Sequence, residues 1–201
     1  MRILDLFSGA GGAAMGYHRA GFEVVGVDIN PQPRYPFEFV RCDALTFLAS
    51  SFVDLSKFDA IHASPPCQAY ANVTAWRGDR SEHPDLIDAT REALNAAGLP
   101  WVMENVPEAP LRPDLLLCGS HFGLRIKRHR IFESSPRIFS LIPTCRHRDI
   151  LPFMHKGERA FADAMHCDWM TNREARQAIP PAYTAFIGEF LAQHIRTAVA
   201  S

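Results

Sequence analysis

Short apolar runs alternate with helical patterns along the first two thirds of the chain. The apolar runs lie at residues 2–7, 23–28, 37–42, 59–64 and 101–106. Between them, residues 11–21 and 84–98 have the pattern of helices, and the second of these begins with a proline in its first turn and ends at a glycine. This alternation predicts an α/β protein with a mostly parallel sheet and covering helices.

The periodicity fails from about residue 133 to residue 168, where prolines and mixed charge predict an irregular excursion rather than a second core. Residues 179–200 then place apolar side chains at the i, i+3, i+4 spacing of a helix with one apolar stripe. We therefore divide the chain into an α/β core at residues 1–132, a short irregular basic excursion at 133–168, and a C-terminal helix at 169–201 that packs back on the core.

The length and the cysteines narrow the class of protein. A chain of 201 residues fits one main domain, because domains cluster at about 100 to 150 residues. Five irregularly spaced cysteines indicate free thiols in a reducing compartment. Without a run apolar enough for a membrane span and without a secretory leader, we expect no membrane partner and a cytoplasmic location, in the host cytoplasm if the chain is viral.

The net charge of -1 hides a basic segment between residues 125 and 159. Nine basic residues face three acidic ones there, which leaves six net positive charges and predicts a surface that faces phosphates. A solvated loop with scattered charge is the alternative. The basic residues are Arg125, Lys127, Arg128, Arg130, Arg137, Arg146, Arg148, Lys156 and Arg159.

A glycine-rich segment follows the first predicted strand. In DLFSGAGGAAMG, Gly9, Gly11 and Gly12 lie directly before a predicted helix. Glycines at this place allow a tight turn and close approach of a ligand, and Asp28 at the end of the second strand is placed to accept hydrogen bonds from ribose hydroxyls. The pattern predicts an adenosine-like ligand, but it does not separate a nicotinamide cofactor from S-adenosylmethionine.

Four short motifs follow one another along the chain: LDLFSGAGG, SPPCQAY, MENVPEA and GLRIKRHRIFE. In this order they resemble the motifs of the DNA cytosine methyltransferases that act at carbon 5, closely over residues 1–132 and more loosely over 171–195. The resemblance implies a Rossmann-like, S-adenosylmethionine-dependent methyltransferase fold. It also implies that the excursion at 133–168 is a reduced target-recognition segment.

The resemblance assigns four catalytic residues. Cys67 matches the nucleophile, whose thiolate adds to carbon 6 of cytosine so that carbon 5 accepts a methyl group from a sulfonium. A free thiol with a pKa of about 8.5 is mostly protonated at neutral pH, so we expect a rigid, partly electropositive pocket around it. Glu104 matches the acid that holds the target ring, and Arg128 and Arg130 match the arginines that hold the cytosine carbonyl and the acid. Ile126 departs from the family pattern, which has glutamine there.

The resemblance also assigns the residues that surround S-adenosylmethionine. Ile29 is expected against the adenine and Asp43 near its amino group. Before the last motif, RQAIPPAY, the usual Gly-Asn is replaced by Arg176 and Gln177, which puts the cofactor affinity in question. The full expected set is Phe7, Ser8, Gly9, Ala10, Gly11, Gly12, Asp28, Ile29, Asp43, Ala44, Pro66 and Leu86.

Cys145, His147, His155, His166 and Cys167 form a loose group of metal-binding residue types. Because no Cys-x-x-Cys spacing supports a zinc site, we predict no metal from the sequence.

The short excursion leaves little protein to recognise bases, although a duplex target has to be flipped out of its stack. We expect a minimal DNA methyltransferase, and the same chemistry on single-stranded DNA or a free cytosine nucleotide is the alternative. A separate recognition subunit or a homodimer is a further expected kind of partner. Two other classes stay open: a non-catalytic module that binds DNA or S-adenosylmethionine, and a nicotinamide enzyme.

Overall fold

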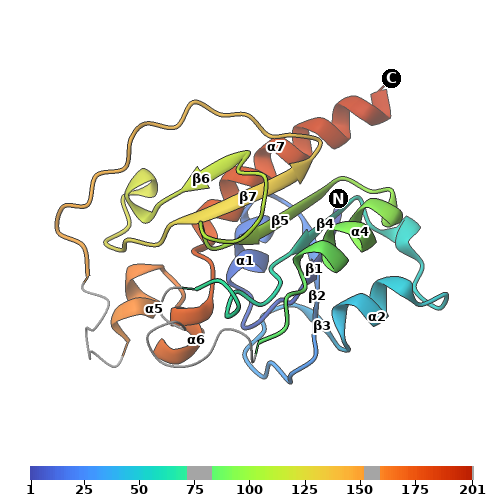
Figure 1. Cartoon of the computed structure of the whole chain (residues 1–201), viewed down its shortest axis with the longest axis horizontal. Helices are drawn as coiled ribbons and strands as arrows, with labels where there is room; N and C mark the ends of the chain where they lie inside the picture. Colours follow the sequence, from blue (N-terminus) through green and yellow to red (C-terminus); the bar gives the residue numbers. More distant parts are fainter. Residues whose placement is uncertain (72–82, 152–158, 201) are drawn as a thin grey trace.

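A seven-stranded sheet forms the centre of the molecule (Figure 1). The computed structural model describes residues 1–71, 83–151 and 159–200. The strand order is β3-β2-β1-β4-β5-β7-β6, and β7 alone runs antiparallel to its neighbours among the described strands. The predicted α/β fold with a mostly parallel sheet is therefore confirmed. The strands are β1 Arg2–Leu6, β2 Glu23–Asp28, β3 Glu38–Arg41, β4 Ala60–Ala63, β5 Trp101–Asn105, β6 Leu115–Leu117 and β7 Arg130–Ser135.

Two layers of helices cover the sheet. On one face lie α1 (Gly12–Arg19), α5 (Ala160–Ala164), α6 (Asn172–Gln177) and α7 (Pro181–Ala200), which share one apolar cluster. The other cluster includes α2 (Ala44–Ala49) and α4 (Ile87–Ala97). Within the described ranges, the connections contain two short 3-10 helices, η1 (Leu55–Lys57) and η3 (Gly119–Phe122). The strands β1, β2, β4 and β5 are largely buried because both faces of the sheet are covered there.

The strand predictions hold for the first five strands and miss the last two. Each of the five apolar runs contains one strand from β1 to β5, whereas β6, β7 and α2 were not predicted. β7 extends from Arg130 to Ser135, so the sheet continues past residue 132, where we had placed the end of the core.

The C-terminal region contains two helices, α6 and α7, where one was expected. α7 packs closely on α1 because Gly16 leaves room for it: a Cβ on Gly16 would lie 2.2 Å from the carbonyl oxygen of Pro181. The Thr184 hydroxyl donates to the carbonyl oxygen of Ala13 at 2.8 Å. The helix therefore reaches the sheet mainly through α1.

The excursion after β7 has no helix or strand between residues 136 and 151, and it runs around the β6 edge of the sheet (Figure 1). Its far end includes the short helix α5, which was not predicted. Beyond α5, Trp169 Nε1 donates to the carbonyl oxygen of Ala10 at 2.8 Å, which joins this region to the glycine turn. Among the described residues, no helix is long and apolar enough to cross a membrane.

Candidate active site

The sheet topology brings the predicted catalytic residues to one edge. The carboxyl ends of β1, β4 and β5 lie side by side, with Leu6 paired to Ala63 and Ala63 to Met103. β7 runs in the opposite direction, so its first residues lie beside the end of β5. The glycine turn, the Cys67 turn, Glu104 and the two arginines therefore come from four strands and meet at one place, which is where open α/β sheets bind ligands.

Glu104 is a buried carboxyl beside an arginine. Its residue is 5% exposed, and Arg130 Nε lies 2.6 Å from its Oε1. No hydrogen bond of good geometry reaches Oε1 from the described residues. Burial raises the pKa of Glu104, although Arg130 and Arg128 oppose this rise. The expected tendency of Glu104 to hold a proton thus has a physical cause in the fold.

Arg128 is buried as well, and its Nε has no hydrogen-bond partner among the described residues. Burial and the charge of Arg130 lower its pKa to about 9. The backbone holds this segment in place: the Tyr183 hydroxyl donates to the Arg128 carbonyl oxygen at 2.6 Å, and Arg130 Nη1 donates to the His129 carbonyl oxygen at 2.8 Å. A buried guanidinium nitrogen without a partner is costly unless a ligand uses it.

The environment of Cys67 differs in one respect from the expected electropositive pocket. Its thiol pKa is raised, mainly by burial and further by Glu104, while Arg130 and Arg128 lower it by less. The two arginines are thus close enough to act on the thiol, but burial outweighs them.

Asn105 holds the turn that carries Cys67. Its side-chain amide donates to the Pro65 carbonyl oxygen at 3.0 Å, and its Oδ1 accepts from the Val106 backbone N–H at 2.9 Å. The residue is 1% exposed. Sequence reasoning did not single it out, although it lies directly after Glu104 in the MENVPEA motif.

A buried hydrogen-bond chain leads from α1 to Ser64. The Tyr17 hydroxyl lies 2.9 Å from His62 Nδ1, and His62 Nε2 lies 2.9 Å from the Ser64 hydroxyl. The Ser64 side chain also lowers the pKa of Glu104, against the larger rise from burial. Burial lowers the pKa of His62 to about 3, so its ring is neutral and one nitrogen donates while the other accepts. Nothing in the sequence pattern marked His62, which lies inside an apolar strand.

The glycine turn has the backbone conformation that glycine favours. Phe7, Gly9 and Gly11 have φ values of 56°, 50° and 84°. A Cβ on Gly9 would meet no atom within 4 Å, so the turn faces open space. The Gly9 N–H donates to Asp28 Oδ2 at 2.9 Å, and the Asn30 N–H donates to Oδ1 at 2.8 Å. The carboxylate of Asp28 is thereby fixed beside the turn.

Two further observations fit an adenosyl ligand at this turn. The Ser8 hydroxyl is buried and has no partner among the described residues. Ile29 is 61% exposed beside Asp28, where an adenine ring would cover it.

Several other residues expected around the cofactor cap helices or pack in the core. Asp43 caps α2 by accepting from the Thr46 N–H at 2.8 Å, and Ala44 is the buried first residue of that helix. A Cβ on Gly12 would lie 2.3 Å from the Ile179 carbonyl oxygen, so this glycine permits close packing of the last motif. Leu86 directly precedes α4, and Pro66 is half-buried next to Cys67.

Two of the three residues at which the chain departs from the family pattern, Ile126 and Arg176, pack against the protein, and the third, Gln177, is exposed. Ile126 is 2% exposed. The Arg176 guanidinium lies over the Phe161 ring, 4.1 Å from its centroid.

The five residues that the sequence analysis grouped as metal-binding types do not form one cluster in the structure. Cys145 and His147 lie in one cluster with Cys118 and His129, which the sequence analysis did not include. The Cys167 thiol is buried and donates to the Met165 carbonyl oxygen at 3.6 Å. His155 lies outside the described residues.

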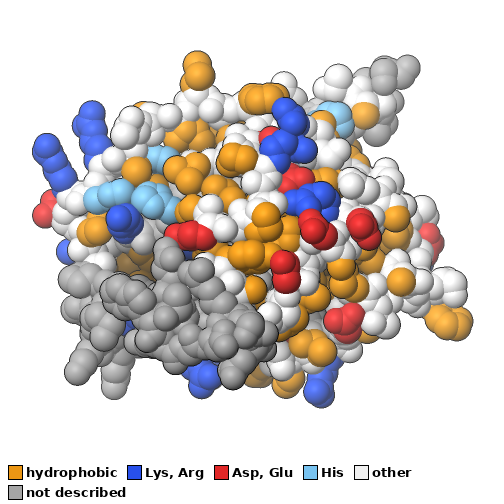
Figure 2. All heavy atoms as spheres, viewed as in Figure 1, with side chains coloured by type: hydrophobic (Ala, Val, Ile, Leu, Met, Phe, Trp, Pro, Cys, Tyr) orange, Lys and Arg blue, Asp and Glu red, His pale blue; other side chains and the backbone are white. Residues whose placement is uncertain are grey.

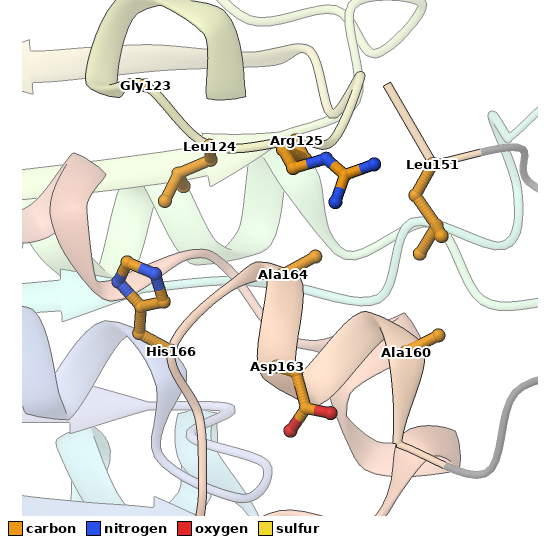
Figure 3. Close-up of a pocket in the computed structure, with 8 residues that line it drawn as sticks. All are labelled: Gly123, Leu124, Arg125, Leu151, Ala160, Asp163, Ala164 and His166. Carbon is orange, nitrogen blue, oxygen red and sulfur yellow. The ribbon is translucent and has the colours of Figure 1, made fainter. Parts of the chain in front are cut away.

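A hollow of about 400 Å³ lies between the segment at residues 123–125 and α5 (Figure 3). None of its described lining residues belongs to the group around Cys67. Its lining is Gly123, Leu124, Arg125, Leu151, Ala160, Asp163, Ala164 and His166.

The chain belongs to the C-5 cytosine-specific DNA methylase family. The model of that family matches residues 1–110 of the 201 residues. The chain is 31% identical over 123 residues to the type II methyltransferase M.HgiGI of Herpetosiphon aurantiacus, a match that covers 55% of this chain and 94% of that relative. The family resemblance drawn from the four motifs is thus confirmed.

Other relatives are much longer than the part that this chain matches. M.FnuDI of Fusobacterium nucleatum is 32% identical over 85 residues, which are 39% of this chain and 24% of that enzyme. M.XorII of Xanthomonas oryzae pv. oryzae is 28% identical over 145 residues, which are 64% of this chain and 30% of that enzyme. Among solved structures, a Spodoptera frugiperda DNMT2 variant matches 78% of this chain and 53% of its own, with 20% identity and a TM-score of 0.47.

Proposed function

We propose that this protein transfers a methyl group from S-adenosylmethionine to carbon 5 of cytosine in DNA through a transient covalent bond to Cys67. The observation that carries the proposal is the convergence of Cys67, Glu104, Arg128 and Arg130 at one strand edge. There the buried Arg128 Nε has no hydrogen-bond partner among the described residues, and Glu104 Oε1 has the Arg130 charge beside it but accepts no well-aligned hydrogen bond. A binding module has no need of a nucleophile beside an acid and two arginines.

The glycine turn fits the proposed cofactor. Asp28 would accept from the ribose hydroxyls, Ile29 would cover the adenine, and the open space at Gly9 would admit the chain of the methionine part. Bound S-adenosylmethionine supplies an electrophilic methyl group on a sulfonium. Cys67 follows β4, and the glycine turn follows β1. Because β1 and β4 are parallel neighbours, the two turns lie next to each other at the carboxyl ends of these strands.

The protein side chains divide the chemistry between them. The Cys67 sulfur gives its proton to solvent water and bonds to carbon 6, and the electron pair of the double bond between carbons 5 and 6 forms a double bond between carbons 4 and 5. The pair displaced from the double bond between carbon 4 and ring nitrogen 3 takes a proton from Glu104, whose pKa burial raises. Carbon 5 then takes the methyl group, and the pair of the broken carbon–sulfur bond stays on the donor sulfur, which leaves as a neutral thioether. Solvent water takes the proton from carbon 5, the pair of that bond restores the double bond between carbons 5 and 6, the Cys67 sulfur leaves as a thiolate, and the ring nitrogen returns its proton to Glu104.

The two arginines have different tasks in this proposal. Arg130 orients the Glu104 carboxyl, since its Nε lies 2.6 Å from Oε1. Arg128, with an unpaired Nε, is placed to donate to the cytosine carbonyl oxygen. Both charges also favour the thiolate of Cys67 once a substrate has displaced water.

DNA is the substrate class that the exposed charges favour. Five exposed cations follow or precede β7, and phosphate contacts supply most of the affinity of proteins for DNA. They are Arg125, Lys127, Arg137, Arg146 and Arg148. Because so little chain remains for base recognition, we expect a short or relaxed recognition sequence.

The test uses a duplex oligonucleotide with 5-fluorocytosine, whose fluorine cannot leave carbon 5 as a proton does, so the adduct is trapped. With S-adenosylmethionine present, the wild-type chain should form a covalent adduct that mass spectrometry maps to Cys67. Cys67→Ser should form none, and Cys42→Ser, which removes a half-buried thiol directly after β3, should form it like the wild type.

Substrate class is decided by the same protein with labelled S-adenosylmethionine on duplex DNA, single-stranded DNA and dCMP. Transfer to duplex DNA supports the proposal as stated, and transfer to single strands or dCMP alone would move the target to those substrates. A folded chain that binds S-adenosylmethionine but forms no adduct on any substrate would make it a binding module. Binding of NAD without binding of S-adenosylmethionine would overturn the cofactor assignment.

A further inference from the structure

Two cysteines and two histidines that do not belong to the group around Cys67 lie together. Their ligand atoms, one each from Cys118, His129, Cys145 and His147, all lie within 4.8 Å of one another. The Cys118 sulfur lies 3.3 Å from His147 Nε2, and the Cys145 sulfur lies 3.4 Å from His129 Nε2. Nothing in the proposed methyl transfer uses these four side chains.

We infer that these four residues bind one zinc ion in a closed tetrahedral site. In such a site the zinc–sulfur distance is about 2.3 Å and the zinc–nitrogen distance about 2.0 to 2.1 Å, which places sulfur about 3.6 Å from nitrogen. The two measured sulfur–nitrogen distances, 3.3 and 3.4 Å, are near this value. Two thiolates and two imidazoles are a ligand set that suits zinc rather than calcium or magnesium, which prefer oxygen.

The ligands come from three separate segments of the chain. Cys118 precedes η3, His129 precedes β7, and Cys145 and His147 lie in the excursion. Cys118 is fully buried, His129 and Cys145 are half-buried, and His147 is exposed. In Figure 2, histidine side chains gather on this face beside lysine and arginine side chains. An ion here would therefore be anchored in the core and reached from the surface.

Neighbouring hydrogen bonds hold the ligand loops in place. The Arg146 N–H, between the two excursion ligands, donates to the Ser120 hydroxyl at 3.1 Å. His121 Nδ1 accepts from the Cys118 N–H at 3.2 Å. Metal sites depend on such support around their ligands. The excursion has no helix or strand between residues 136 and 151, so a zinc ion would supply a tether that the backbone lacks.

The position of His129 links this site to the active site. It lies between Arg128 and Arg130 in an extended segment, so its side chain points away from theirs. Its carbonyl oxygen accepts from Arg130 Nη1 at 2.8 Å. A zinc ion on His129 would thus fix the backbone that aims both arginines, a consequence that rests on the proposed function, whereas the zinc site itself does not.

The direct test is metal content. The chain is purified under reducing conditions from cells grown with zinc, dialysed without chelator, and measured by inductively coupled plasma mass spectrometry. We expect about one zinc ion per chain, the stoichiometry of a four-ligand site. Cys145→Ser and His147→Ala, whose side chains are not fully buried, should each lower this content at least tenfold while circular dichroism shows a folded protein. Cys42→Ser and His194→Ala, which lie outside the cluster, are the matched controls and should keep the metal.

Cobalt replacement supplies a second measurement. The cobalt-loaded wild type should show the strong visible absorption of a tetrahedral site with thiolate ligands, and Cys145→Ser should lose it. A folded, reduced wild type without zinc and without this spectrum would overturn the inference, as would unchanged metal content in both cluster variants. Since binding of S-adenosylmethionine and adduct formation are measured separately, failure of the zinc site is distinguishable from failure of the proposed activity.

Discussion

Two buried glutamates on neighbouring strands have opposite pKa shifts. Glu104 on β5 is 5% exposed and Glu133 on β7 is 3% exposed. Arg91 holds both carboxylate oxygens of Glu133, with Nε at 2.9 Å from Oε1 and Nη2 at 3.0 Å from Oε2, and the Arg112 N–H donates to Oε2 at 3.0 Å. Glu104 has Arg130 close by, but Oε1 accepts no well-aligned hydrogen bond.

The difference separates a carboxylate that supports the fold from one that is available to a ligand. Burial raises the pKa of both groups, but at Glu133 the hydrogen bonds and charges of Arg91 and Arg112 outweigh it and the pKa is lowered. At Glu104 burial outweighs Arg130 and Arg128. Partners lower a carboxyl pKa most when they are aligned with it. The less satisfied group lies at the strand edge with Cys67, where the proposed substrate would complete it.

The largest effect expected from this comparison is on activity, in Glu104→Gln. Loss of the proton donor should lower methyl transfer about 10² to 10⁴-fold. Stability should hold or increase, because a pKa that is raised on folding makes the charged form unfavourable in the native state at neutral pH. Labelled transfer and urea unfolding measure the two effects. Glu92→Gln, an exposed glutamate on α4, is the control. A parallel loss of stability and activity would show that Glu104 supports the fold.

Glu133→Gln is expected to lower the stability of the protein and to leave its activity unchanged. Hydrogen bonds to a charged group contribute about 1.5 to 3 kcal/mol, so the variant should lose stability on this scale, with activity per folded molecule unchanged. Its pKa is lowered in the folded state, so the contribution is present above the unfolded pKa and is lost as the pH falls through the folded value. Urea unfolding at neutral pH and at pH values below about 4.3 checks this. The difference between wild type and variant should shrink in acid, and a constant difference would contradict the ionic origin.

Sequence reasoning predicted the part of the fold that local patterns specify. Apolar runs bounded by turn residues located five strands, and the motifs placed Cys67, Glu104, Arg128 and Arg130. β6 is only three residues long, all of them leucine, so its sequence shows no alternation of apolar and polar residues. β7 lies in the stretch that we interpreted as the end of the core, because RIFESS has only two apolar residues and no apolar run of strand length.

The remaining features depend on contacts between distant segments. His62 looks like a strand residue, and only the fold places it between Tyr17 and Ser64. The cluster of Cys118, His129, Cys145 and His147 has irregular spacing because its ligands come from three segments that the sheet brings together. The raised pKa of Cys67 likewise reflects burial, which a motif does not report.

The smallest expected effect is a shift in the pKa of the Cys67 thiol. It tests whether the charges of Glu104 and Arg130 both act on the Cys67 sulfur. Glu104 raises the Cys67 pKa and Arg130 lowers it, so Glu104→Gln should lower this pKa and Arg130→Gln should raise it. The pH dependence of iodoacetamide alkylation, followed on the Cys67 peptide by mass spectrometry, measures both, because the thiolate is the reactive form. Arg196→Gln, an exposed arginine on α7, is the matched control and should change nothing. If both variants shifted the Cys67 pKa in the same direction, the thiol would be responding to a change in the packing around it rather than to the two charges. Opposite shifts are expected only if the carboxyl and the guanidinium both act directly on the sulfur, as the proposed chemistry requires.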